Sequence, residues 1–115
     1  MPAAAAPRTH TLRRALASAR IAIEHVRSGG EDWRNDQKTV DAASKRVEEV
    51  AEQLKRVSPA QQAAMPGISW KEAKGMREVL AHDYGQVDVE ILADVVDNDL
   101  PKLIEEIEAA FAAEA

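Results

Sequence analysis

Apolar residues recur along most of the chain at alternating spacings of three and four, which is the period of an amphipathic α-helix. The cleanest stripe consists of Val40, Ala43, Val47, Val50, Leu54 and Val57. An earlier stripe consists of Leu12, Leu16, Ala19, Ile23 and Val26. No window of useful length alternates apolar and polar residues as a half-buried strand does. The pattern therefore predicts helices that bury one face each in an antiparallel bundle.

Capping residues and helix breakers predict where these helices begin and end. Ser28-Gly29-Gly30 should close the first helix. Ser58-Pro59 has the form of a helix start, so we expect a short helix over residues 59–64 that ends before Pro66-Gly67. Ser69 and Glu72 fit a capping box. They predict a further helix from Trp70 to Asp83 or Tyr84, with Ala73, Met76 and Leu80 facing the core and Gly85 as its stop.

The last third of the chain continues the helical pattern but leaves one boundary open. Asp88 is a suitable cap for a helix that contains Leu92, Val95 and Val96. Pro101 then either kinks this helix or follows a new start capped by Asp99. Apolar positions continue as Leu103, Ile104, Ile107 and Phe111. The expected fold is an all-α, antiparallel four-helix bundle with an additional short helix, over residues 9–111. We expect residues 1–8 to be disordered and 112–115 to be frayed.

Composition limits the kinds of site that the chain can hold. At 115 residues it is most simply one domain, and the absence of cysteine excludes disulfides and thiolate metal sites. The three histidines are scattered without metal-ligand spacing. The first residues lack the long apolar run of a signal peptide, and no stretch approaches the roughly 18 apolar residues of a membrane span. We therefore expect a cytoplasmic protein with no structural metal and no cofactor.

The charge of −5 is distributed unevenly along the chain. Residues 1–30 carry +4, residues 31–82 are neutral and residues 83–115 carry −9. The basic first helix and the acidic last helix could simply attract each other. They could also separate an RNA-facing side of the bundle from a solvated side.

The segment MREVLAHDY, residues 76–84, contains the most reactive set of side chains. Histidine exchanges protons near neutral pH, and arginine can stabilise charge on a phosphate. On an ideal helix Arg77 and His82 lie about 140° apart, so one copy makes a loose site. Two copies related by a two-fold axis would bring two Arg77, two His82 and two Tyr84 together. That cluster suits metal-free RNA cleavage. The same residues also fit an ordinary helix end, with His82 favoured by the helix dipole.

Several stretches resemble the HepT-like HEPN ribonuclease toxins. Arg77, His82 and Tyr84 match the family's Arg-x4-His-x-Tyr motif, and residues 68–88 (ISWKEAKGMREVLAHDYGQVD) resemble its W-x5-MR-x4-H-x-Y-x2-VD pattern. Residues 97–107 (DNDLPKLIEEI) resemble the start of the family's final helical stretch. Residues 29–54 also resemble a stretch of the family that has an aromatic residue and a Gln/Thr-x-Asp-Ala step. The resemblance extends over about residues 10–111.

This resemblance implies a fold, an activity and a partner. Such proteins are HEPN-type helical bundles that form homodimers, and their motif helices meet in a composite, metal-independent endoribonuclease site. It implies that Arg77 and His82 are catalytic and that Tyr84 is the site of AMPylation or helps to position RNA. The implied system is a type II-like toxin–antitoxin pair, in which a minimal nucleotidyltransferase antitoxin silences the toxin by modifying that tyrosine. The implied substrate is RNA, with tRNA as one candidate.

Two other hypotheses remain open at this point. The chain could be a non-catalytic binding or regulatory subunit of a nucleotidyltransferase, which Glu78 beside Arg77 and the acidic net charge favour. It could also be a helical interaction protein with an incidental motif. Lys71 and Lys74, one turn before Arg77, could contact the RNA backbone or form a solvated face with Glu72 and Glu78.

Overall fold

The computed structural model describes the backbone of residues 5–80 and 87–114, and the side chains of residues 10–76 and 87–113. Every element assigned in this part of the chain is helical, which confirms the predicted all-α class. In order, the elements are α1 (Ala5–Gly29), η2 (Trp33–Asn35), α2 (Gln37–Lys55), α3 (Pro59–Ala64), α4 (Trp70–Leu80), α5 (Val89–Asp94), η3 (Val95–Asp99) and α6 (Leu100–Glu114). Helices α1 and α6 extend into both terminal segments for which disorder or fraying was expected. The domain limits of 9–111 stay a prediction.

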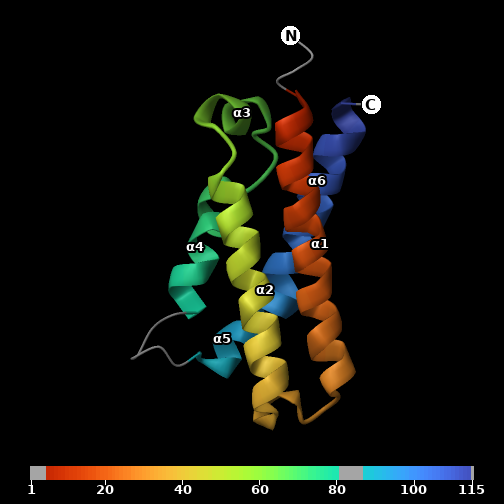
Figure 1. Cartoon of the computed structure of the whole chain (residues 1–115), viewed down its shortest axis with the longest axis vertical. Coiled ribbons are helices and arrows are strands. Elements are labelled where there is room, and N and C mark those ends of the chain that lie inside the picture. Colours follow the sequence, from red (N-terminus) through yellow and green to blue (C-terminus); the bar gives the residue numbers. More distant parts are fainter. Residues whose placement is uncertain (1–4, 81–86, 115) are drawn as a thin grey trace.

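The bundle is elongated, about 49 Å along its long axis, and its long helices run side by side (Figure 1). Helices α1 and α2 form an antiparallel pair, with α4 beside α2 and α6 behind α1. The apolar stripe predicted on α2, together with Val57 beyond its end, is buried at every position. In the α1 stripe only Ile23 is half-buried rather than buried. The hydrophobic period of the sequence therefore identified the core-facing sides of this pair.

Most of the predicted helix boundaries are confirmed. Helix α1 ends at Gly29, and Gly30 takes a left-handed φ of 76° in the turn that follows. The Ser58 hydroxyl accepts a hydrogen bond from the backbone N–H of Gln61, and α3 covers the predicted residues. The Asp88 carboxylate accepts from the first N–H groups of α5. The C-terminal limit predicted for α4, at Asp83 or Tyr84 with Gly85 as its stop, lies outside the described residues.

The structure decides between the two alternatives at Pro101. Helices α5 and α6 form one continuous helical run, and η3 between them is a turn of π-helix. The N–H of Leu100 bonds the carbonyl of Val95, five residues earlier, and Leu100 itself has helical backbone angles. Asp99 lies inside this run, so a separate helix capped by Asp99 is wrong. The wider turn precedes a proline, which has no N–H to continue the regular pattern.

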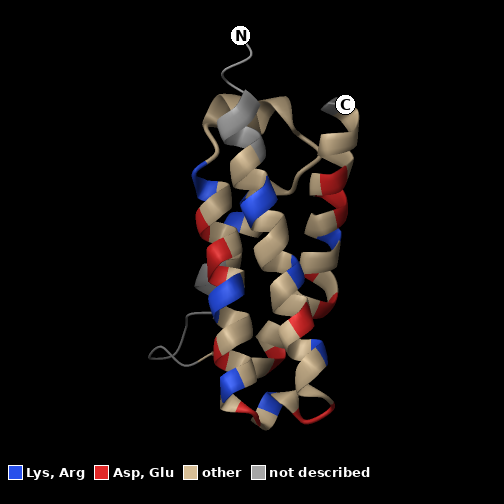
Figure 2. Ribbon diagram, turned by 45° about the vertical axis from the view of Figure 1, so that its right-hand side comes forward, with Lys and Arg blue, Asp and Glu red and all other residues tan. Residues whose placement is uncertain are grey.

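The charge asymmetry of the sequence partly reflects attraction between the first and last helices (Figure 2). Arg20 of α1 forms an ion pair with Glu108 of α6. The guanidinium of Arg13 lies over the ring of Phe111, 5.4 Å from its centroid. In the part of the chain that the structure describes, no helix is long and apolar enough to cross a lipid bilayer.

Candidate active site

The motif singled out in the sequence lies at the end of α4 and in the segment after it. Arg77 is part of α4, but its side chain and that of Glu78 lie outside the described residues. His82 and Tyr84 lie outside them altogether. The structure describes instead the frame that holds the motif on both sides, from Ser69 to Met76 and from Val87 to Glu90.

The start of α4, the helix that carries Arg77, is hydrogen-bonded to a carboxylate of α6. Glu106 accepts one hydrogen bond from the backbone N–H of Ser69 and a second from its hydroxyl, each 2.9 Å long. Glu72 accepts from Lys102, also on α6, at 3.3 Å. The capping box predicted between Ser69 and Glu72 is therefore wrong, because Glu72 is not the residue that binds the backbone N–H of Ser69. Glu106 occupies the N–H that Glu72 was expected to bind, because α6 packs within reach of the start of α4.

The opposite flank of the motif helix is held by the loop before it and by α3. The indole N–H of Trp70 donates to the carbonyl of Met65 at 2.9 Å, so this side chain anchors the start of α4 to the loop before it. The ammonium of Lys74 donates to the side-chain carbonyl of Gln62 at 3.1 Å. Ala73 and Met76 are buried as predicted. Both flanks of α4 are thus fixed before the chain reaches Arg77.

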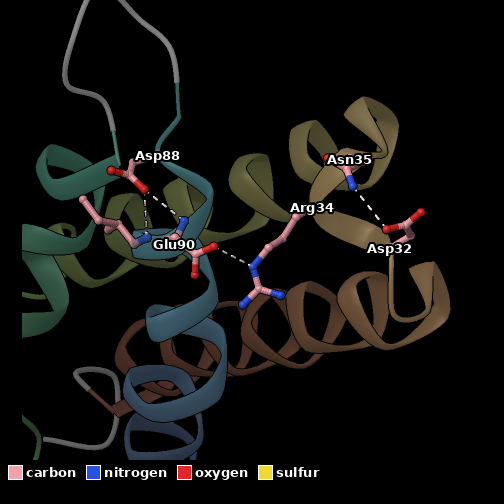
Figure 3. A network of polar contacts seen from close by, with 6 residues as sticks. Asp32, Arg34, Asn35, Asp88 and Glu90 are labelled. Atoms are coloured by element: carbon pink, nitrogen blue, oxygen red, sulfur yellow. Dashed lines mark hydrogen bonds and ion pairs between the residues drawn. The ribbon is translucent and has the colours of Figure 1, made fainter.

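The chain that follows the motif is anchored at the other end of the bundle (Figure 3). Asp88 caps α5, and Glu90 in its first turn accepts a hydrogen bond of 3.0 Å from Arg34 of η2. The guanidinium of Arg34 lies 4.9 Å from the ring centroid of Trp33, which is itself buried. Arg34 therefore links the α1–α2 connection to α5, the helix that begins five residues after Tyr84.

Acidic residues gather on the flank of α4 that faces η3 and α6. Partial burial is the main reason that the pKa of Asp99 is raised above its ordinary 3.8, and the carboxylates of Asp94 and Glu72 raise it further. The ammonium of Lys102 acts in the opposite direction.

The two lysines predicted as RNA-backbone contacts have different surroundings. Lys71 is exposed. Lys74 is half-buried and bonded to Gln62, so it is less free to follow a phosphate than the sequence suggested. The anchoring roles of Glu106, Lys102 and Arg34 were missed from the sequence, because each acts on a residue at least 30 positions away. Among the described residues, no group of three His, Asp or Glu side chains has the geometry to hold a metal ion.

Comparison with known proteins gives a family match over most of the chain. A family model described as "Ribonuclease HepT-like" matches residues 15–110. The chain is 36% identical over 73 residues to a "Probable ribonuclease HepT" of Thermococcus cleftensis, a match that covers 64% of this chain. It is 31% identical over 78 residues, 68% of this chain, to "Putative RNase MJ0127" of Methanocaldococcus jannaschii.

The curated relatives are longer than the parts that match. The matches cover 66% of the Thermococcus protein and 64% of the Methanocaldococcus one. A third relative, "Gamma-glutamylcyclotransferase and putative RNase MJ0434" of Methanocaldococcus jannaschii, is 37% identical over 67 residues, which is 58% of this chain and 30% of that protein. No solved structure matches the chain at a comparable level.

Proposed function

Because the chain belongs to the HepT-like ribonuclease family, we propose that it is a metal-independent endoribonuclease that acts through Arg77, His82 and Tyr84. The observation that carries the proposal is the family match over residues 15–110, which includes the whole motif. The names of the relatives support a ribonuclease activity. The fixed frame on both sides of the motif supports a site whose groups are held in place.

The proposed chemistry assigns one role to each side chain. His82 takes the proton from the ribose 2′-OH that attacks the phosphorus, and the second His82 of the dimer gives a proton to the leaving oxygen. Arg77 stabilises the charge that develops on the phosphate oxygens, where its planar fork can bind two of them. Tyr84 positions the RNA by hydrogen bonding or stacking.

The proposed site requires two copies of the chain. On one ideal helix Arg77 and His82 would be separated by about 140°, whereas a two-fold axis that joins two α4 helices would bring both sets to one phosphodiester. We therefore propose a homodimer whose interface includes α4. In this arrangement the contacts from Glu106 and Gln62 set the direction in which each α4 meets its partner.

We further propose that the protein is the toxin of a toxin–antitoxin pair in the cytoplasm. Its partner is a minimal nucleotidyltransferase that transfers AMP from ATP to the Tyr84 oxygen, with release of pyrophosphate. The added phosphodiester places a negative charge where the substrate phosphate binds, and its nucleoside occupies the same space. Modification at this position therefore blocks RNA binding without unfolding the bundle.

The direct experiment is cleavage of total RNA and of tRNA by the purified, unmodified protein in the presence of EDTA. His82→Ala should reduce the rate by about 10²- to 10⁴-fold, which is the usual contribution of acid–base catalysis. Arg77→Ala should cause a comparable loss. Size-exclusion chromatography and circular dichroism of each variant show whether the dimer and the helices are retained.

Three results separate this proposal from its alternatives. Equal and negligible cleavage by the wild-type protein and His82→Ala rejects the ribonuclease function. Cleavage that EDTA abolishes rejects the metal-independent mechanism. A non-catalytic subunit of a nucleotidyltransferase is the second candidate, because Glu78 adds a carboxylate beside the motif arginine. Stable co-purification with the nucleotidyltransferase, without growth arrest when the chain is expressed alone, supports that candidate.

A further inference from the structure

A basic groove lies between α1 and α2, apart from the Arg77–Tyr84 motif. The groove has a volume of about 440 Å³, and none of the residues that line it comes from α4. Its walls carry three arginines, Arg14 from α1 and Arg46 and Arg56 from α2 and its C-terminal cap. The two acids in the lining are Glu49 and Glu52, so the formal charge of the groove is +1 in a chain of −5.

Three arginines of α1, Arg13, Arg14 and Arg20, lie on two different flanks of the helix. Arg13 and Arg20 face α6, where Phe111 and Glu108 are their partners. Arg14 lies on the other flank, with Ser18 and the groove. It is exposed, and among the described residues it makes no ion pair or side-chain hydrogen bond. The attraction between α1 and α6 therefore accounts for Arg13 and Arg20 but leaves Arg14 available.

The charged residues of α2 that line the groove recur at helical spacing, and the positive charge of its arginines is partly neutralised by glutamates. Arg46 donates to Glu49 at 2.9 Å, and the Ser18 hydroxyl contacts the same carboxylate oxygen at 3.4 Å. Glu52 also has an interaction partner. Arg56 is exposed and, within the described part of the chain, its guanidinium has no such partner. The acids of the groove are therefore engaged, while two of its three guanidiniums are free to bind an external anion.

We propose that this groove binds the sugar–phosphate backbone of the RNA substrate, as a contact surface separate from the cleavage motif. The proposal rests on the proposed ribonuclease function for the identity of the polyanion. The two free guanidiniums come from opposite walls of the groove, Arg14 from α1 and Arg56 from the end of α2, and Arg46 lies ten residues before Arg56, which corresponds to about 15 Å of helix rise. Guanidiniums spread over that length do not converge on one small anion. They suit successive phosphates of a single strand, each bound by a planar fork of donors.

The test measures RNA binding in a background that cannot cleave. The His82→Ala protein and the same protein with Arg14→Gln and Arg56→Gln are titrated with a short fluorescent oligouridylate at several salt concentrations. Each lost phosphate contact on a single strand should lower the salt slope of log K by about 0.7. Two contacts correspond to a slope smaller by about 1.4 and to binding about 25-fold weaker near 0.1 M salt, with a difference that vanishes toward 1 M.

A matched control distinguishes an effect of the groove arginines on RNA binding from an effect of the lower net charge. Arg27→Gln with Lys38→Gln removes the same two charges from exposed positions outside the groove and should change the slope little. Equal affinities and slopes for the groove variant and this control overturn the proposal. If the groove variant retains RNA binding but loses the nucleotidyltransferase partner, the groove is a protein-binding surface and the proposal is also overturned. Loss of binding with the groove variant supports it even if the wild-type protein proves unable to cleave RNA.

Discussion

Glu106 of α6 binds Ser69 at the start of the motif helix through both of its carboxylate oxygens, at 2.9 Å each. The two residues are 37 positions apart in sequence, and their contact joins the last helix to the one that carries Arg77. A hydrogen bond to a charged group contributes more than one between neutral groups, and an unpaired buried N–H is costly. The position of the motif therefore depends on the C-terminal helix as much as on α4 itself.

Glu106→Ala should destabilise the fold by about 2 kcal/mol, because two charge-assisted hydrogen bonds to Ser69 are lost. Urea unfolding followed by circular dichroism measures this difference. Glu105→Ala is the matched control, since Glu105 is the neighbouring residue, carries the same charge and is exposed. Glu106→Gln retains one acceptor oxygen and should recover part of the loss. Equal stability of the two alanine variants would show that the Ser69 contact contributes nothing.

Two glycines in helices should respond to alanine in opposite directions. In Gly29→Ala the new Cβ would lie 2.8 Å from the Cβ of Trp33 and 3.0 Å from Thr39, so the turn after α1 must shift and stability should fall. In α4, a Cβ at Gly75 meets nothing within 4 Å. Gly75→Ala should therefore stabilise the helix by about 0.5–1 kcal/mol. Thermal unfolding of both variants, at a single protein concentration, tests the contrast.

Asp99→Asn should make the protein more stable at neutral pH. Burial, Asp94 and Glu72 raise the pKa of Asp99 above 3.8, so the ionised carboxylate costs free energy in the folded state. Below the unfolded pKa the carboxyl group of Asp99 is protonated in both states, so the wild-type protein loses no stability. Above the folded pKa the group is ionised in both states, and the full loss of stability is present. The advantage of Asp99→Asn should therefore shrink as pH falls through the raised folded pKa, and it should be absent below the ordinary value of 3.8.

Asp97→Asn controls for the change in net charge in the same turn of helix. Urea unfolding at a series of pH values gives the free energy of unfolding of both variants and the wild type. An advantage of Asp99→Asn that is independent of pH, or one that Asp97→Asn shares in full, contradicts the assignment to Asp99.

Tyr84→Phe tests the proposed control by the partner. Phenylalanine lacks the oxygen that accepts AMP, so the variant should escape silencing while His82 and Arg77 remain in place. Expression of Tyr84→Phe together with the nucleotidyltransferase should arrest growth, whereas the wild-type pair should not. Intact-mass measurement should find the adenylyl group on the wild-type chain alone. Modification of the variant, or full rescue of growth, would exclude Tyr84 as the acceptor.

The parts of the fold that could be predicted from sequence are those fixed by local periodicity and capping. The α2 stripe from Val40 to Leu54 needs only the helical repeat, and α3 needs only the Ser58 cap and Pro59. The capping of α4 could not be predicted, because the partner of Ser69 comes from α6 and depends on tertiary packing. Local sequence also could not distinguish a continuous helix through η3 from a new start at Asp99.

In the candidate sites too, residues within one local motif could be predicted from the sequence, and residues brought together by tertiary packing could not. Arg77, His82 and Tyr84 were found by their chemistry and by resemblance to a family, and their roles stay predictions. The groove arginines were not singled out, because Arg14 and Arg56 are far apart in sequence and share no motif. Only the antiparallel pairing of α1 with α2 places them on one surface. A basic excess in residues 1–30 was the single signal in the sequence that pointed toward them.

The π-turn at Val95–Asp99 contains one residue more than a regular helical turn does. Deletion of one residue there would remove this extra residue and let the turn close to regular α-helix, so Leu103 and Ile107 would keep facing the interior. Insertion of one residue into the regular part of α6 between Leu100 and Glu106 would instead rotate everything C-terminal to it by about 100° and move Glu106 out of reach of Ser69. Variants of this fold should therefore tolerate loss of a residue at the π-turn but not a length change within α6 before Glu106.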